Sequence, residues 1–321
     1  MGEFELIRQF FAAARCARAG EGVALGIGDD CALLQVAVGA QLAVSTDTLV
    51  DGVHFPVAAD PFLLGQRSLA VAVSDLAAVG AAPLAFTLAL TLPTVAADWL
   101  RAFAEGLDAM AEACGVRLVG GDTTCGPLSL TVTVFGSVPA GLALTRSGAQ
   151  VGDLLCVGGA LGDAAGALPL VLGEQVVPEA IGAPLLARYW SPVPQLALGQ
   201  ALRGRATAAL DISDGLLADC GHIALASGVA LQIEQSRLPL SDALRQLLGE
   251  AQARQAALTG GDDYILAFTL PAGHLAPLLA QGWPVHVIGS VQAGSGVSLV
   301  NAQGEDITPV VRGYQHFRET P

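Results

Sequence analysis

Apolar residues in the first half of the chain recur with a helical period in some segments and a strand period in others. The opening segment predicts an amphipathic helix because its apolar residues are three or four positions apart, namely Phe4, Leu6, Ile7, Phe10, Phe11 and Ala14. Asp60 followed by Pro61 predicts the start of a second helix, which we expect to end at Gly80. A third helix is expected over 97–114. Short apolar or alternating runs predict strands, which are 24–27, 43–45, 84–92, 116–119 and 130–138.

The second half shows the same mixture after a segment rich in Gly and small residues, Pro139–Gly152. Strands are predicted at 153–157, 207–210, 229–233, 264–270, 285–291 and 297–300. Helices are predicted at 184–203, 216–227 and 274–281, and the glycine loop 158–162 is expected to open another. The fold class is therefore α/β, as layered mixed sheets and helices in two domains. We place these domains at 1–148 and 149–321; no strict repeat relates them.

Aspartate recurs in short motifs marked by Gly or Ser, most of them directly after an apolar run, where we expect a strand to end. Carboxylates gathered there are hard oxygen ligands that suit Mg²⁺ held between protein and phosphate. A helix cap would explain Ser213 or Asp214, but not a second acid at the end of the preceding strand. The motifs are Gly28-Asp29-Asp30, Ser45-Thr46-Asp47, Ser74-Asp75, Gly120-Gly121-Asp122, Asp211-Ile212-Ser213-Asp214-Gly215 and Gly260-Gly261-Asp262-Asp263.

The charged residues narrow the function further. All 15 basic residues are Arg, so lysine-dependent sites such as the P-loop and the protein-kinase strand are excluded. The formal net charge of −14 argues against nucleic-acid binding, which needs a basic surface. A polyanionic substrate is compatible with this charge only if divalent cations reverse the local sign. If the protein handles phosphate, metal ions supply most of the positive charge.

The remaining chemistry in the sequence indicates a cytoplasmic protein. The 6 Cys residues form no Cys-x-x-Cys pair and read as reduced thiols. The N-terminus lacks the basic flank and apolar core of a signal peptide. The longest apolar stretch contains Asp75, Gly80 and Pro83, so it predicts a helix, a turn and a strand rather than a membrane span. No Gly-x-Ser-x-Gly or His-Glu-x-x-His motif supports a hydrolase.

Single residues sharpen the metal and phosphate hypothesis. Asp75 falls in the last turn of its predicted helix, where the helix dipole is unfavourable to a carboxylate unless a cation compensates. Arg146 stands near the domain junction, and the absence of Lys favours it as a phosphate contact. His54 closely follows the second aspartate motif. The glycine loop 158–162 favours close backbone packing, with phosphate contact as the alternative, because no acid follows at the spacing of a dinucleotide site.

Several of these motifs together resemble the thiamine-monophosphate kinase family, which belongs to the superfamily of aminoimidazole ribonucleotide synthetase. The resemblance runs in order from residue 2 to residue 317. It is carried by Gly2–Ile7, Gly26–Ala32, Ser45–Val50, Gly52–Phe55, Gly120–Thr124, Asp211–Leu216 and Gly313–Phe317. It implies two mixed α/β domains, a homodimer that pairs its N-terminal sheets, and transfer of the γ-phosphoryl group of ATP to thiamine monophosphate.

The resemblance also implies roles for residues. Several Mg²⁺ ions would be held by Asp30, Ser45, Thr46, Asp47, Asp75, Asp122, Asp211 and Asp214. ATP would be contacted by Phe103, Gly121, Asp122, Arg146 and Ser213. Thiamine monophosphate would be contacted by His54, Asp262 and Phe317. Tyr314 is the alternative to Phe317, and Asp263 the alternative to Asp262, because this chain has Asp where the family often has the longer Glu.

The acceptor is itself a phosphate with nearly two negative charges, so we expect direct transfer without a general base or a phospho-enzyme. One alternative is another ATP-dependent activity of the superfamily. Selenophosphate formation expects an activated Cys beside a Lys, and this chain has no Lys. The other alternative is a non-catalytic protein that binds divalent ions.

Overall fold

The structure is a computed structural model that describes residues 2–18 and 20–314. The chain divides into two compact units, each considered by itself below. The first comprises residues 1–76 and 81–143, and the second comprises 77–80 and 144–321. Residues 144–148, which the sequence pattern assigns to the first domain, lie in the second unit. Within the described part of the chain, no helix is both long and apolar enough to span a membrane.

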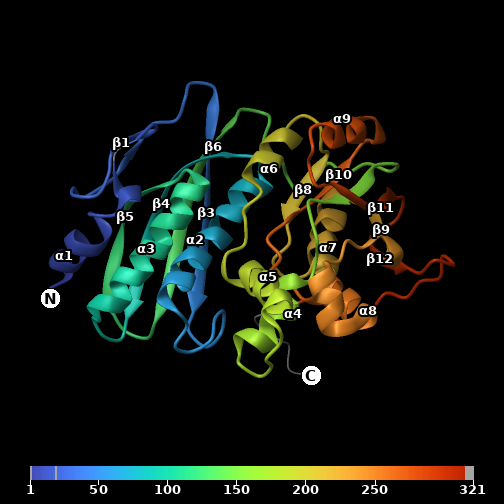
Figure 1. Cartoon of the computed structure of the whole chain (residues 1–321). Coiled ribbons are helices and arrows are strands. Elements are labelled where there is room, and N and C mark those ends of the chain that lie inside the picture. Colours follow the sequence, from blue (N-terminus) through green and yellow to red (C-terminus); the bar gives the residue numbers. More distant parts are fainter. Residues whose placement is uncertain (1, 19, 315–321) are drawn as a thin grey trace, which may run out of the picture. The chain divides into compact units, whose positions relative to one another are not determined.

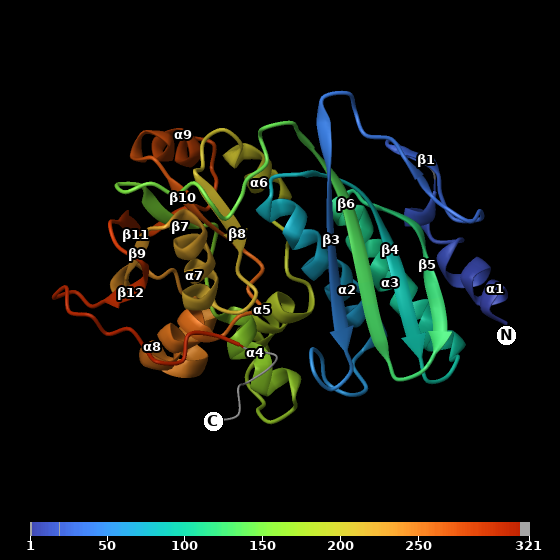
Figure 2. The ribbon, with the colours of Figure 1, turned by 180° about the vertical axis from the view of Figure 1, so that it is seen from behind.

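A four-stranded sheet forms the centre of the first unit, with the strand order β3-β6-β4-β5. Its strands are β3 (Ala40–Val50), β4 (Ala82–Leu92), β5 (Arg117–Cys125) and β6 (Ser129–Pro139). β4 and β5 are parallel, whereas β6 pairs antiparallel with both β3 and β4. Two helices, α2 (Pro61–Ala78) and α3 (Ala97–Cys114), lie on the same face of this sheet (Figures 1 and 2).

Burial alternates along these strands, as expected for a sheet with helices on one face only. In β6, residues 130, 132, 134, 136 and 138 are buried and the residues between them are partly exposed. Thr46 and Thr48 of β3 lie on the other face, where their Oγ1 atoms are each 2.9 Å from those of Thr133 and Thr131. The two faces of β3 therefore have different chemistry.

The local signals for α2 and α3 are confirmed. The Oδ1 atom of Asp60 accepts hydrogen bonds from the backbone N–H groups of Phe62 and Leu63, at 2.9 and 3.2 Å. These bonds cap the start of α2, because the first N–H groups of a helix have no partner within it. α3 has the predicted bounds and ends at Gly115, which adopts a left-handed conformation.

The N-terminal segment differs from the single amphipathic helix expected. It contains α1 (Glu3–Leu6), a π-helical turn at Ile7–Phe11 and a 3₁₀ turn at Arg15–Ala17. Phe10 and Phe11 are buried, so the apolar spacing correctly indicated a packed face. A small antiparallel pair follows, β1 (Val23–Leu25) with β2 (Leu33–Leu34).

A six-stranded sheet forms the second unit, in the order β12-β9-β11-β7-β10-β8. Its strands are β7 (Leu154–Val157), β8 (Ala208–Asp211), β9 (Ala230–Glu234), β10 (Leu266–Leu270), β11 (His286–Gln292) and β12 (Gly296–Val300). β12 and β9 are parallel, and the other pairs are antiparallel. Every residue of β10 is buried, so this part of the sheet is covered on both faces.

The helices of the second unit are α4 (Asp163–Val171), α5 (Glu179–Trp190), α6 (Leu196–Leu202), α7 (Leu216–Ser227), α8 (Asp242–Thr259) and α9 (Leu275–Ala280). The helix expected over 184–203 is wrong as a single element. Its middle contains Pro192 and Pro194, which cannot continue a helix, so α5 and α6 are separate. α8 was not anticipated, and Gly249 breaks its helical geometry with a φ of 73°.

Two aspartate motifs expected at strand ends lie instead inside strands. Ser45-Thr46-Asp47 is in the middle of β3, and Gly120-Gly121-Asp122 is in β5. The polar side chains continue the strand alternation, and backbone pairing with β6 and β4 extends past them. Polarity alone therefore misplaced the ends of both strands.

Candidate functional site

A cluster of oxygen ligands lies where β3 faces α2 in the first unit. Ser45 and Asp47 are two residues apart on β3, so their side chains leave the strand on the same face. The Ser45 hydroxyl donates a hydrogen bond to the Oδ2 atom of Asp75, which is on α2. Burial, and then the charge of Asp75, raise the pKa of Asp47 to about 6. Two carboxylates that repel each other at a partly buried site are suited to hold a cation.

Thr46 does not join this cluster through its side chain. Its hydroxyl lies on the opposite face of β3, next to Thr133. Strand geometry requires this, because neighbouring side chains point to opposite faces. The hydroxyl of Thr46 is therefore outside the ligand set that the structure brings together.

A cavity of about 1050 Å³ in the first unit contains two more of the predicted ligands. Asp30, from the loop after β1, and Asp122, from β5, both line it, and both are exposed. Gly121 lines it as well, with a φ of +150°, and a side chain there would meet the carbonyl oxygen of Leu88. A glycine is needed at this position so that β5 can approach β4.

The N-terminal segment forms another wall of this cavity, through Ile7, Arg8, Phe11 and Ala12. It is attached to α3 just beyond that wall. The Nε atom of Arg15 lies 2.8 Å from Asp108 Oδ2, and the backbone N–H of Cys16 donates to Asp108 Oδ1 at 2.6 Å. Burial raises the pKa of the Cys16 thiol to about 12, so the thiol is unreactive while the segment is docked. Asp108 is not among the site residues predicted from the sequence.

His54 and Phe103 have structural contacts in the first unit. The Nδ1 atom of His54 accepts a hydrogen bond from the backbone N–H of Val50 at 3.0 Å, which holds the turn after β3. The imidazole remains half-buried. Phe103 is fully buried in α3 and stacks on Trp99 at 5.1 Å between ring centroids. The expected nucleotide contact of Phe103 does not agree with this position, because no part of the ring is accessible.

The loop between β8 and α7 carries the predicted ligands of the second unit. Asp211 ends β8, Ser213 is exposed, and Asp214 is half-buried. The carboxylate of Asp219, in the first turn of α7, accepts hydrogen bonds from the backbone N–H groups of residues 213, 214 and 215 at 3.0–3.1 Å. Burial raises the pKa of Asp219 to about 6, against the effect of these N–H groups. Sequence reasoning missed Asp219, although an acid in the first turn of a helix is itself a signal.

The loop before β10 lies against this same loop. The backbone N–H of Asp262 donates to the carbonyl oxygen of Ser213 at 2.8 Å. Asp262 has a φ of +61°, and its Oδ1 atom accepts a hydrogen bond from the Tyr264 hydroxyl at 3.0 Å. The backbone N–H of Tyr314, near the C-terminus, donates to the carbonyl oxygen of Asp214 at 2.9 Å. Asp262 and Tyr314 are thus both positioned at the β8–α7 loop, whereas Phe317 lies outside the described residues.

Asp263, the alternative to Asp262, has a structural position. Its two carboxylate oxygens accept the backbone N–H of Gly162 at 2.8 and 3.1 Å. Burial holds the pKa of Asp263 well above the usual range, and the Gly162 N–H opposes this effect. The charges of Asp163 and Asp262 raise the pKa further, and that of Arg188 lowers it. Asp263 therefore supports the glycine loop from inside, and Asp262 is the more accessible acid.

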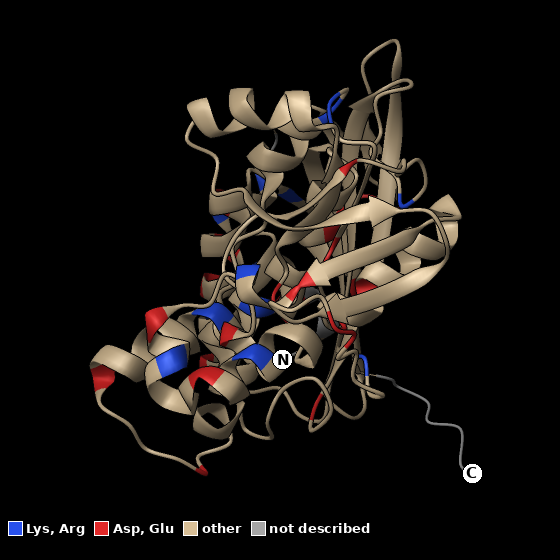
Figure 3. Ribbon diagram, turned by 90° about the vertical axis from the view of Figure 1, so that its right-hand side faces the viewer, with Lys and Arg blue, Asp and Glu red and all other residues tan. Residues whose placement is uncertain are grey.

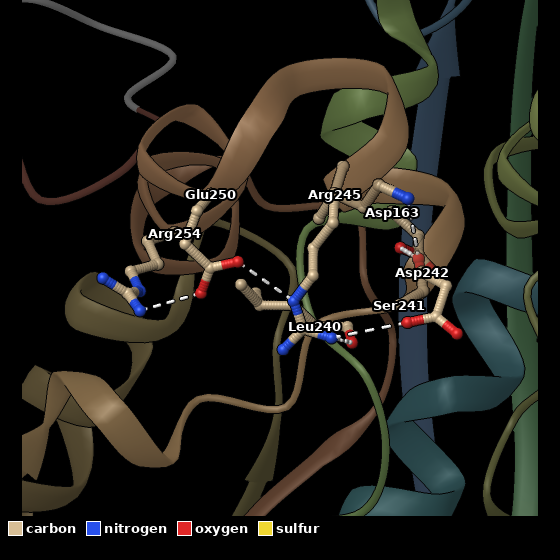
Figure 4. Close-up of polar contacts among 8 residues, drawn as sticks. Asp163, Leu240, Ser241, Asp242, Arg245, Glu250 and Arg254 are labelled. Carbon is tan, nitrogen blue, oxygen red and sulfur yellow. Dashed lines mark hydrogen bonds and ion pairs between the residues drawn. The ribbon is translucent and has the colours of Figure 1, made fainter.

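The start of α4 is held by a second polar group shown in Figure 4. The Ser241 hydroxyl donates to Asp163 Oδ1 at 2.6 Å, and Arg245 joins the carbonyl oxygen of Leu240 to Glu250. Burial raises the pKa of Asp163, and the Ser241 hydrogen bond opposes it. These contacts join α4 to α8. Because the charged side chains are bonded to other groups of the protein, they offer no further ligand site.

Arg146 is exposed, and its backbone carbonyl accepts a hydrogen bond from the Ser227 hydroxyl at 3.2 Å. Its backbone is thus fixed while its guanidinium group faces solvent. Every blue segment in Figure 3 is an Arg, since the chain has no Lys. The exposed position is compatible with a phosphate contact.

The ligands in the first unit fit magnesium that arrives with a nucleotide. Within residues 2–18 and 20–314, no group of three or more His, Cys, Asp or Glu side chains could hold a metal ion by itself. Mg²⁺ is commonly held by one or two carboxylates together with waters and substrate phosphates. The pair Asp47 and Asp75, with the Ser45 hydroxyl, is a donor set of this kind.

Comparison with known proteins identifies the relatives of this chain. Residues 28–138 match the family model "AIR synthase related protein, N-terminal domain". The chain is 45% identical over 322 residues to the thiamine-monophosphate kinases of Salmonella typhimurium and Escherichia coli, with 98% of each chain covered. The crystal structure of thiamine-monophosphate kinase from Stenotrophomonas maltophilia matches with a TM-score of 0.85 and 46% identity, over 95% of this chain and 98% of that one.

A structure of AaThiL complexed with AMPPCP and TMP matches with a TM-score of 0.80 and 31% identity, covering 88% of this chain and 89% of that one. The hydrogenase maturation protein HypE of Escherichia coli shares the fold at 22% identity, with a TM-score of 0.76 and 99% of both chains covered. These matches confirm the expected fold class.

Proposed function

Because this chain belongs to the thiamine-monophosphate kinase family, we propose that it transfers the γ-phosphoryl group of ATP to thiamine monophosphate, giving thiamine diphosphate and ADP. It is a phosphotransferase by family. The structural observation that best supports the proposal is the pair of carboxylates, Asp47 and Asp75, beside the Ser45 hydroxyl. Both carboxylates are half-buried and their charges repel, so a bound cation would stabilise the pair.

Phosphate repulsion is the main obstacle to this reaction. Two unit charges 4 Å apart repel by about 4 kcal/mol at an effective dielectric constant near 20, and both phosphates carry more than one charge. When bound, Mg²⁺ supplies the positive charge that offsets this repulsion and aligns the phosphates. Several Mg²⁺ ions are proposed. In the first unit the residues that would hold them are Asp30, Ser45, Asp47, Asp75 and Asp122. In the second unit they are Asp211 and Asp214.

The other residues bind and orient. We assign Gly121 and Asp122, in the cavity of the first unit, to the nucleotide. In the second unit, Arg146 and Ser213 are the proposed nucleotide contacts. His54 and Asp262 are proposed to contact thiamine monophosphate, with Phe317 or Tyr314 as the aromatic partner. The acceptor phosphate is already a competent nucleophile, so no side chain needs to remove a proton. Transfer is therefore direct, and no residue becomes phosphorylated.

We further propose that the enzyme is a homodimer that pairs the exposed faces of its first-unit sheets. This face carries Leu42 and Val44, which are 46% and 55% exposed, beside the Thr46 and Thr133 hydroxyls. Apolar side chains in a row on an open sheet face favour burial against a partner. The alternation that keeps Thr46 out of the ligand cluster places it on this face.

The decisive experiment is to incubate the protein with ATP, Mg²⁺ and thiamine monophosphate and to measure thiamine diphosphate by chromatography. We expect diphosphate and ADP in equal amounts, and none when Mg²⁺ is chelated. Free thiamine is the control acceptor and should give no product, because it lacks the phosphate that the site requires. ATP hydrolysis without diphosphate would contradict the proposal, and so would a phosphorylated Asp or His trapped during turnover.

A further inference from the structure

The β8–α7 connection has the form of an anion-binding site. A strand, a short loop with a glycine and a helix N-terminus present free backbone N–H groups to a phosphate in many α/β proteins. Here the strand is β8, the loop ends at Gly215, and α7 begins at Leu216. The position thus offers a nucleotide phosphate a direct backbone contact, unless those N–H groups already have partners.

The backbone N–H groups of the β8–α7 loop already have a partner within the protein. One carboxylate oxygen of Asp219 accepts the N–H groups of Ser213 at 3.1 Å, Asp214 at 3.0 Å and Gly215 at 3.1 Å. The side chain of Asp219 comes from the first turn of the same helix, and the residue is 4% exposed. It therefore occupies the place in which a phosphate oxygen would bind, and it does so with the same charge sign.

The carbonyl groups of the loop are also used. The carbonyl oxygen of Ile212 accepts the N–H of Tyr264 at 2.8 Å, that of Ser213 accepts Asp262, and that of Asp214 accepts Tyr314. Gly261 makes the close approach to Ser213 possible, because a Cβ atom there would lie 2.5 Å from the Ser213 oxygen. With its backbone donors and acceptors satisfied, the loop presents only side chains to a ligand.

A related arrangement with a single N–H group occurs at the start of α4. The N–H of Gly162, at the end of the glycine loop after β7, is accepted by both oxygens of buried Asp263 at 2.8 and 3.1 Å. Two strand–loop–helix connections of the second unit thus have an internal carboxylate where a phosphate would otherwise bind.

We propose that Asp219 is a positioning residue that converts a phosphate-binding loop into a cation-binding one. Its carboxylate blocks direct backbone contact with phosphate and fixes the loop so that Asp211 and Asp214 act as metal ligands. The nucleotide phosphates then meet this loop through a divalent cation and the Ser213 side chain. This inference rests on the proposed function for the nucleotide and for the ligand roles of Asp211 and Asp214, and its test measures cation binding directly.

The test is a direct titration with Mn²⁺ in the presence of a non-hydrolysable ATP analogue, followed by calorimetry or electron paramagnetic resonance. Asp219→Asn keeps the size of the side chain but removes the charge that strengthens its three hydrogen bonds. We expect Mn²⁺ affinity to fall about 10- to 100-fold, the range for loss of a group that orients metal ligands. The Mg²⁺ concentration needed for half-maximal turnover should rise by a similar factor.

Asp153→Asn is the matched control in the same unit. Asp153 is also a buried carboxylate, and its Oδ2 atom accepts the N–H of Gln150 at 3.0 Å and the hydroxyl of Thr207 at 2.6 Å. Its carboxylate holds Gln150 and Thr207 rather than the 213–215 backbone, so Asp153→Asn should lower the melting temperature without changing Mn²⁺ affinity. Equal Mn²⁺ affinities in Asp219→Asn and the wild type would overturn the proposal, as would an equal loss in Asp153→Asn.

If Asp219→Asn does not fold, hydrogen exchange in the wild-type protein decides the matter. The amides of residues 213–215 should be protected without metal or nucleotide, because Asp219 already holds them. Rapid exchange there in the ligand-free protein would refute the proposal. The two hypotheses are tested by different measurements. Absence of thiamine diphosphate would contradict the proposed function. Mn²⁺ binding that depends on Asp219 would still support the role inferred for Asp219.

Discussion

Asp108→Ala should release the N-terminal segment that forms one wall of the cavity. The Asp108 carboxylate accepts the backbone N–H of buried Cys16 at 2.6 Å and pairs with Arg15 at 2.8 Å. Removing it leaves the Cys16 N–H without this acceptor and Arg15 without one of its two acidic partners, the other being Glu112. The segment then depends mainly on its apolar contacts.

The magnitude follows from these two losses. An unsatisfied buried N–H costs about 1–3 kcal/mol. The ion pair adds little to this, because the Arg15 side chain is 61% exposed and solvent screens it. Local opening should therefore become easier by about 1–3 kcal/mol, a factor of about five to 150 in the opening equilibrium. Asp108→Asn keeps an oxygen acceptor for Cys16 and should have a much smaller effect.

Thiol labelling at Cys16, resolved by peptide mass spectrometry, measures this opening. Cys16 is buried and should react only when the segment detaches, so labelling should be fastest in Asp108→Ala and intermediate in Asp108→Asn. Exposed Cys31 controls for reagent, and buried Cys156 controls for global unfolding. The KM for ATP should rise with the labelling rate. Unchanged labelling of Cys16 in Asp108→Ala would refute the reasoning.

Four further predictions test other parts of the structure. Asp47→Asn should abolish Mg²⁺-dependent turnover without altering the circular dichroism spectrum, and near-normal turnover would remove Asp47 from the metal ligands. Gly121→Ala should lower the melting temperature and weaken binding of the ATP analogue, because its φ of +150° and the nearby Leu88 carbonyl leave no room for a Cβ atom; strain of this kind costs about 1–3 kcal/mol, and an unchanged melting temperature would contradict it. Since the pKa of Asp263 is raised in the folded state, its contribution to stability is greatest below the unfolded pKa of about 4 and is lost as the pH rises through the raised value. Melting temperatures measured from pH 5 upward should fall more steeply in the wild type than in Asp263→Asn, and parallel curves would refute this. Val44→Arg should convert the proposed dimer to a monomer in size-exclusion chromatography, because the new charge would be buried without a partner; an unchanged elution volume would exclude this face.

Local elements were readable in the sequence. The bounds of α3 and α7 agree with their apolar spacing and their terminal glycines, and Asp60 caps α2 as its position before Pro61 predicts. These features depend on residues within a few positions of one another. The prediction of a magnesium and phosphate site rested on residue type alone. Many carboxylates in a chain without Lys favour that chemistry whatever their positions in the fold.

The membership of the site was decided by packing. Ser45 and Asp75 are 30 residues apart, and they meet only because α2 lies on the face of β3 from which the Ser45 side chain projects. The same pleat removes the Thr46 hydroxyl from the cluster, although the sequence motif places all three residues of Ser45-Thr46-Asp47 together. Which face of a strand is covered is a property of the assembled sheet, and no local pattern contains it.

Burial and backbone pairing decided the remaining roles. Phe103 is in the core because α3 packs its apolar side inward, and Asp263 is enclosed while its neighbour Asp262 is not. The position of Asp219 depends on the N–H groups of a loop that exists only after β8 and α7 have formed. Short-range preferences specify helices, strands and caps, whereas contacts between distant segments depend on how those elements pack, and the geometry of the candidate site consists of such contacts.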